Sequence, residues 1–114
     1  MPVFTVRSGS KDTLPKLKVG DLIDFFEDDD NTYSVKACDE RFVICTCPHE
    51  TMDTVWYTII DFERDVRGET NLVFNLYDFT DQAKIDECLR DLQNGEIEVS
   101  SRRCIDLDIW KITN

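Results

Sequence analysis

The sequence lacks the features that mark several common protein classes. Its 114 residues contain no apolar run near the roughly 20 residues that a membrane-spanning helix requires. The N-terminal stretch MPVFTVRSGSK lacks the apolar core of a secretory signal. Basic residues are also scarce, because 13 Lys and Arg stand against 24 Asp and Glu, for a net charge of -11. Such a chain repels phosphate backbones, so we expect neither direct nucleic-acid binding nor membrane binding.

Histidine is scarce, and the only one is His49. It lies in CTCPHE (45–50), where Cys45 and Cys47 are two residues apart, so their sulfurs share one face of a strand. Zinc prefers tetrahedral Cys and His ligands, but one strand seldom wraps three ligands around an ion. We interpret the two cysteines as small buried hydrophobes and expect no cofactor. A metal-binding regulatory module that uses Cys45, Cys47 and His49 is kept as an alternative.

The groups that enzymes use are scarce as well. Five cysteines form an odd number without a repeated spacing, which in a chain without a secretory signal is typical of reduced thiols in a cytosol. A cysteine nucleophile would have only His49 as its histidine base, and the sequence marks no third group. There is no glycine-rich phosphate loop. The sequence therefore predicts a cytoplasmic protein that is not an enzyme.

Apolar residues are nevertheless sufficient for one folded domain, since 41% of the chain is hydrophobic. Residues 1–17 have few apolar side chains and are interrupted by glycine, serine and proline, so we predict a flexible basic arm. Within it, Val3 and Phe4 could add a short edge strand. Residues 18–114 are predicted to form a single globular domain.

Most of this domain has the patterns of β-strands. A turn at KVGD (18–21), in which Gly20 supplies backbone freedom, precedes the first strand. Asp39 and Glu40 form a hairpin connection, and Gly68 is expected in a loop. The segments predicted as strands are 22–26, 33–37, 41–47, 54–61, 71–77, 96–99 and 105–109.

One segment, TDQAKIDECLRDLQNGE, has the helical period instead. Its apolar positions recur at i, i+3, i+4 and i+7: Ile85, Cys88, Leu89 and Leu92. We predict an amphipathic helix at about 80–94, capped by Thr80 or Asp81 and ended by Asn94-Gly95. The predicted fold class is α+β, with this one helix and a mainly antiparallel β-sheet or small partly open barrel of six or seven strands.

Acidic residues are concentrated in the folded part. Residues 1–20 sum to +3, so the remaining 94 residues carry -14. The densest group, residues 27–30, fills a strand connection, where exposed carboxylates have no desolvation to raise a pKa for acid/base chemistry. An ordered array of carboxylates can instead occupy a basic groove made for nucleic acid, although it can also serve only solubility. The residues predicted to bind a partner are Glu27, Asp28, Asp29, Asp30, Asp39, Glu40, Asp86 and Glu87.

Six stretches carry a resemblance to a family: KVGD (18–21), VKACDERFVICT (35–46), TVWYTIID (54–61), VRG (66–68), NLVF (71–74) and EVSSR (98–102). In these stretches the sequence resembles a group of small uncharacterised proteins of bacteria, their phages and plasmids. The resemblance implies no activity. The polar residues of the six stretches are either turn and ion-pair residues or a shared binding face: Asp39, Glu40, Arg41, Asp61, Arg67, Asn71 and Arg102.

Small size, acidity and few catalytic groups are also similar in character to anti-CRISPR inhibitors. We therefore predict a non-enzymatic acidic binding protein of a mobile element, in the cytoplasm of a bacterial host. Its expected partner is the basic surface of a host nucleic-acid-handling protein, such as a CRISPR effector, which it would inhibit as a nucleic-acid mimic. A housekeeping accessory interaction domain is the further alternative.

Overall fold

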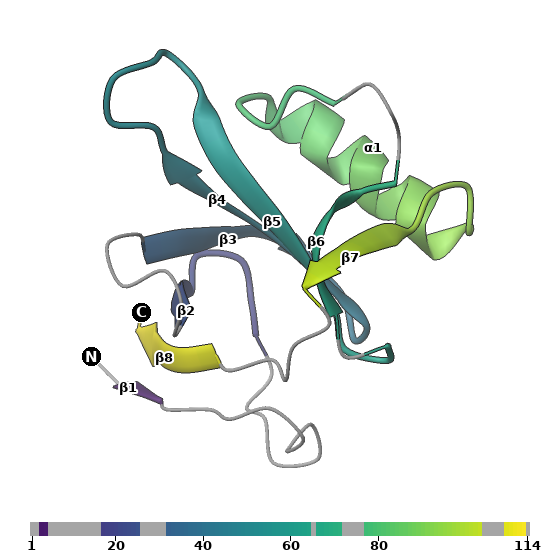
Figure 1. The fold of residues 1–114 in the computed structure, drawn as a ribbon, viewed down its shortest axis with the longest axis horizontal. Helices are drawn as coiled ribbons and strands as arrows, with labels where there is room; N and C mark the ends of the chain where they lie inside the picture. Colours follow the sequence, from purple (N-terminus) through teal and green to yellow (C-terminus); the bar gives the residue numbers. More distant parts are fainter. Residues whose placement is uncertain are drawn as a thin grey trace.

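The structure, a computed structural model, describes residues 3–4, 17–25, 32–64, 66–71, 77–103 and 109–113. They form an antiparallel sheet and one helix, which confirms the predicted α+β class (Figure 1). In chain order the elements are β1 (Val3–Phe4), β2 (Leu22–Phe25), β3 (Thr32–Cys38), β4 (Phe42–Pro48), β5 (Val55–Asp61), β6 (Val66–Thr70), α1 (Gln82–Gln93), β7 (Val99–Arg103) and β8 (Ile109–Thr113).

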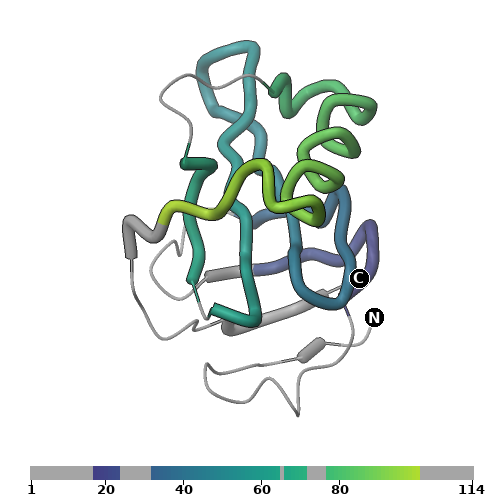
Figure 2. The backbone as a smooth tube through the Cα atoms, turned by 90° about the vertical axis from the view of Figure 1, so that its right-hand side faces the viewer, coloured from purple at the N-terminus to yellow at the C-terminus, as the bar shows by residue number. Residues whose placement is uncertain are grey.

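The strands form one open sheet in the order β1-β8-β2-β3-β4-β5-β6-β7. Strands β2 to β7 follow the chain order, and β8 returns to pair with β2 on one side and β1 on the other. The sheet thus has eight strands when the two-residue β1 is counted. It curls through space, and α1 lies over one part of it (Figures 1 and 2).

Three strands lie elsewhere than the sequence pattern predicts. Gly68, expected in a loop, lies within β6 and pairs with Ile59. The pattern misses β6 because VRGET is mostly polar, and a register shift between Arg67 and Glu69 disrupts its alternation. Strand β7 begins later than the segment predicted at 96–99, and the described part of β8 continues beyond the segment predicted at 105–109. Most of that last segment, and most of the segment predicted at 71–77, lie outside the described residues.

The KVGD turn forms as predicted. Asp21 donates its backbone N–H to the Lys18 carbonyl (3.1 Å), and Gly20 has a φ of 99°, a conformation that glycine adopts without a Cβ clash. Buried Asp21 also accepts from the Lys18 backbone N–H at 3.0 Å. The turn thereby sets the start of β2.

Strand β4 is buried on both faces, as its continuous apolar run predicts. One face joins Val43, Cys45 and Cys47 to a cluster with Ile23 and Ile60. The other face places Phe42 and Ile44 in a second cluster beneath α1. Strand β4 is therefore a wall shared by two hydrophobic clusters.

Helix α1 begins and ends close to the predicted positions. The Asp81 side chain accepts from the Ala83 backbone N–H and caps the first turn. Gly95 follows the cap residue Asn94 with a φ of 75°, and its N–H reaches the Leu92 carbonyl. Within the described part of the chain, no helix has the length and apolar character that crossing a membrane demands.

Candidate functional site

The eight residues predicted to bind a partner divide into three groups. Residues 27–30 lie outside the described part of the chain. Asp39 and Glu40 form the tight β3–β4 connection, as predicted, and Asp86 and Glu87 lie on α1. The structure brings the second and third groups to one side of the molecule, because α1 lies along β3.

Two side-chain hydrogen bonds hold α1 in this position. Gln82, in the first turn of the helix, donates to the Lys36 carbonyl on β3 (2.8 Å). Gln93, in the last turn, donates to Asp39 Oδ2 (2.9 Å). The helix is therefore fixed at both ends, and its exposed side chains have a defined place relative to the β3–β4 turn.

Asp39 is an organiser of this turn. Its Oδ1 accepts from the backbone N–H groups of Arg41 and Phe42, each at 2.7 Å, while Oδ2 accepts from Gln93. Partial burial acts to raise the pKa of Asp39, but the hydrogen bonds from Phe42, Gln93 and Arg41 together lower it below its usual value. The arrangement supports a structural role for Asp39, since both of its oxygens are engaged within the chain.

The lowered pKa of Asp39 gives a predicted pH dependence. Its carboxylate stabilises the fold above the unfolded-state pKa, and this contribution is lost as the pH falls through the folded-state pKa. At pH 7 we expect Asp39→Asn to lower the free energy of unfolding by about 1 to 2 kcal/mol, because hydrogen bonds to a charged acceptor are weakened. Urea denaturation at pH 7, 5 and 3 should show this difference shrinking with acidity. A difference that stayed constant across this range would contradict the prediction.

The other predicted acids on this side remain at the surface. Asp86 is exposed and accepts from Gln82 at 3.1 Å, while Glu87 is 3.3 Å from Lys84 in a solvent-exposed ion pair. Exposed pairs of this kind contribute little to stability. These carboxylates are therefore available to a partner at small cost to the fold.

A second acidic group lies at the end of α1. The Tyr77 hydroxyl donates to Asp91, and the Glu96 carboxyl hydrogen-bonds to the same residue. That hydrogen bond and the neighbouring negative charge raise the pKa of Glu96. Asp91 is thus part of a local hydrogen-bonded group rather than of an open carboxylate array.

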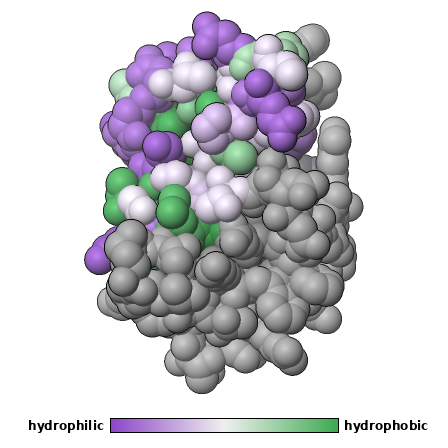
Figure 3. All heavy atoms as spheres, turned by 90° about the vertical axis from the view of Figure 1, so that its left-hand side faces the viewer, coloured by the Kyte–Doolittle hydropathy of each residue, from purple (hydrophilic) through white to green (hydrophobic). Residues whose placement is uncertain are grey.

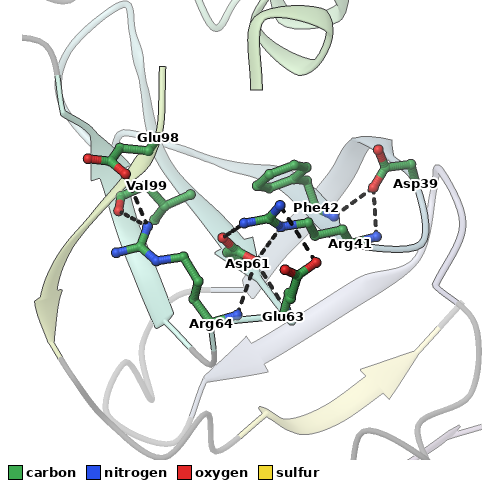
Figure 4. A network of polar contacts seen from close by, with 8 residues as sticks. All are labelled: Asp39, Arg41, Phe42, Asp61, Glu63, Arg64, Glu98 and Val99. Carbon is green, nitrogen blue, oxygen red and sulfur yellow. Dashed lines mark hydrogen bonds and ion pairs between the residues drawn. The ribbon is translucent and has the colours of Figure 1, made fainter. Parts of the chain in front are cut away.

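The structure pairs Arg41 with Asp61, two residues for which the sequence left open an ion-pair role or a place on a shared binding face (Figure 4). Arg41 Nε and Nη2 donate to the two carboxylate oxygens of Asp61, each at 3.0 Å. Asp61, only 1% exposed, also accepts the backbone N–H groups of Glu63 and Arg64. Arg64 in turn donates to the Val99 carbonyl on β7 (2.9 Å). These contacts join the β3–β4 and β5–β6 turns to strands β5 and β7.

The candidate metal ligands do not converge. Cys45 and Cys47 share a face and are buried, with the Cys45 thiol donating to the Thr58 carbonyl at 3.5 Å. Burial raises the pKa of the Cys45 thiol well above its usual value, which disfavours the thiolate that zinc binds. Within the described ranges, no group of three His, Cys, Asp or Glu side chains could hold a metal ion.

His49 organises the β4–β5 turn. Its Nδ1 accepts from the backbone N–H groups of Thr51 and Met52, each at 3.2 Å. Its ring stacks on Trp56, with centroids 4.8 Å apart and an interplanar angle of 25°. No local sequence pattern indicates this arrangement, because the histidine and the tryptophan lie on opposite sides of the polar turn that they stabilise.

Comparisons with known proteins found no matching family model, curated protein or solved structure.

Proposed function

We propose that this chain is a non-enzymatic acidic binding protein that occupies the basic surface of a nucleic-acid-handling protein and thereby inhibits it. The observation that carries the proposal is the defined position of α1, which carries the surface carboxylates Asp86 and Glu87. The helix hydrogen-bonds to β3 through Gln82 and to the β3–β4 turn through Gln93. A rigid set of carboxylates can compete with a phosphate backbone for the same Lys and Arg side chains.

The charge of the whole chain supports the same function. The 94 residues after residue 20 carry -14, because their Asp and Glu residues far outnumber their Lys and Arg residues. Charge of this size accelerates association with a basic surface and makes binding sensitive to salt. The resemblance to proteins of bacteria, phages and plasmids supports a bacterial cytoplasm as the location and a host defence protein, such as a CRISPR effector, as the target.

The test uses the basic proteins of a bacterial lysate that bind phosphocellulose. They are passed over the immobilised chain at low salt, eluted with salt, and assayed for nucleic-acid binding with and without added chain. We expect wild-type chain to retain a nucleic-acid-binding protein and to inhibit its binding. Two neutralised variants, Asp86→Asn/Glu87→Gln and Asp28→Asn/Asp29→Asn/Asp30→Asn, should release it at lower salt.

The matched control is Glu63→Gln/Glu98→Gln. Like Asp86→Asn/Glu87→Gln, it removes two negative charges, but from side chains that face Arg41 and Arg64 rather than from α1. It should elute its partner at nearly the same salt as wild-type chain. Failure of the wild-type chain to retain any basic protein would refute the proposal. Equal elution from all variants would remove the carboxylates from it.

A further inference from the structure

The β4–β5 hairpin extends beyond its neighbours in the sheet. Strands β4 and β5 pair along their whole length, from Phe42 opposite Asp61 to Pro48 opposite Val55. Among the described residues, β3 pairs with β4 only as far as Thr46, and β6 pairs with β5 only from Ile59 onward. In the described part of the chain, the outer end of the hairpin is therefore two-stranded, and it is visible at the upper left of Figure 1.

This outer end of the hairpin carries exposed apolar side chains. Met52, in the turn, is 62% exposed, and Trp56, at the start of β5, is 50% exposed. Figure 3 views the molecule from the side of the hairpin and shows apolar groups among hydrophilic ones on this surface. Single exposed apolar residues are common, but here both residues contact His49: Trp56 stacks on its ring, and Met52 donates its backbone N–H to Nδ1. A methionine and a large aromatic beside one histidine form an anchor of the kind that dominates interface energies.

The anchor is held in place before any partner binds. The His49 ring stacks on Trp56 and accepts two backbone N–H groups of the turn through Nδ1. An exposed tryptophan whose ring is already fixed loses little side-chain entropy on association. If His49 served only to stabilise the turn, its hydrogen bonds to the backbone would be enough. That role does not explain why a tryptophan stacks on it with half of its surface exposed to water.

The charge around the anchor selects the partner. Residues 42–63 contain no Lys or Arg, whereas Glu50 and Asp53 flank Met52 in the exposed turn. An acidic rim disfavours the surface of an anionic membrane, and it also disfavours an identical acidic turn of a second copy. The complementary surface is an apolar pocket bordered by Lys and Arg.

The anchor also lies at the same end of the molecule as the start of α1 (Figures 1 and 2). Tyr57, next to Trp56 in β5, stacks on Phe79 with ring centroids 3.8 Å apart. Phe79 is flanked by exposed Asp78 and is followed by Asp81, the N-cap of the helix. Tyr57 packs in the cluster beneath α1, whereas Trp56 pairs with Cys47, which belongs to the opposite cluster, because neighbouring strand residues point to opposite faces of a sheet. The Trp56 side chain therefore lies on the sheet face away from α1, and its contact with a partner is separate from any contact made by the acids of the helix.

We infer that Trp56 and Met52, braced by His49, insert into an apolar pocket bordered by Lys and Arg on a basic partner protein. This inference rests on the proposed function. In the proposed complex, the carboxylates attract the basic partner, and Trp56 and Met52 provide the apolar contact. Carboxylates set the rate and the salt dependence of such an association, while a buried aromatic anchor sets its lifetime.

The test uses the same phosphocellulose-binding proteins of a bacterial lysate as the probe. Wild-type chain is compared with Met52→Thr/Trp56→Thr, and Val19→Thr is the matched control because Val19 is also 62% exposed but lies in the KVGD turn. We expect the hairpin variant to retain at least tenfold less of the nucleic-acid-binding protein and Val19→Thr to retain it fully. In a separate chain, Met52→p-benzoylphenylalanine should form a photo-crosslink to that same protein, in a peptide that contains apolar and basic residues.

The outcomes separate this inference from the proposed function. Retention by wild-type chain that persists in the hairpin variant overturns the inference and leaves the proposed function standing. No retention by wild-type chain overturns both. In a Trp110→Phe chain, whose only tryptophan is Trp56, a shift of the fluorescence on adding phospholipid vesicles would show that the tip binds a membrane instead. Self-association that Trp56→Thr abolishes would assign it to a second copy, and either result overturns the inference.

Discussion

Replacing Arg41 with alanine should lower the free energy of unfolding by about 3 kcal/mol, because it leaves a buried carboxylate without its cation. Asp61 is 1% exposed and, among the described residues, would keep the backbone N–H groups of Glu63 and Arg64 as its donors. For a domain of this size the change corresponds to a fall in Tm of roughly 10 to 15 °C. Circular dichroism during heating at pH 7 measures it directly.

Two further variants show whether the geometry or the charge is responsible. Arg41→Lys keeps the positive charge but removes the two parallel N–H donors that now face Asp61, so we expect an intermediate loss. Lys84→Ala breaks an exposed ion pair with Glu87 and should change stability by no more than about 0.5 kcal/mol. If Arg41→Ala were as stable as Lys84→Ala, the network in Figure 4 would not hold the sheet end together.

The parts of the fold that could be predicted from the sequence are those with a clear apolar period. Helix α1 was predicted with both of its ends, because its apolar stripe and its capping residues agree. Strand β6 was missed because its position depends on register. Val66 and Thr70 are buried at its ends, but Gly68 interrupts the strand pattern, and the pairing with β5 and β7 places the strand in the sheet.

The candidate site was less predictable because it depends on contacts between distant segments. Asp39 is acidic and lies in a turn, so the sequence predicts that it binds a partner, whereas its hydrogen bonds to Phe42 and Gln93 give it a structural role. Conversely, the exposed Trp56 lies in a segment, 54–61, whose apolar residues predict a buried strand. Its exposure follows from how far β3 and β6 extend beside the hairpin, which no local pattern records.

Truncating Ile44 to alanine should also lower the free energy of unfolding by about 3 kcal/mol. Ile44 is fully buried at the centre of β4 and packs in the cluster beneath α1. Removing its side-chain carbons leaves a cavity, because neighbours from the sheet and the helix are held by other contacts. Urea denaturation followed by tryptophan fluorescence and by helix ellipticity measures the loss.

Strand β4 makes this prediction informative about the whole domain. Val43 points to the opposite cluster, so Val43→Ala should cost about 2 kcal/mol in the same assay, while exposed Val19→Ala should cost less than about 0.5 kcal/mol. Because both clusters share the β4 backbone, each core variant should unfold in one transition seen equally by both probes. Loss of helix ellipticity before the fluorescence change in Ile44→Ala would instead show that α1 detaches from a sheet that remains folded. In that case α1 would not be the rigid support on which Asp86 and Glu87 are presented to a partner.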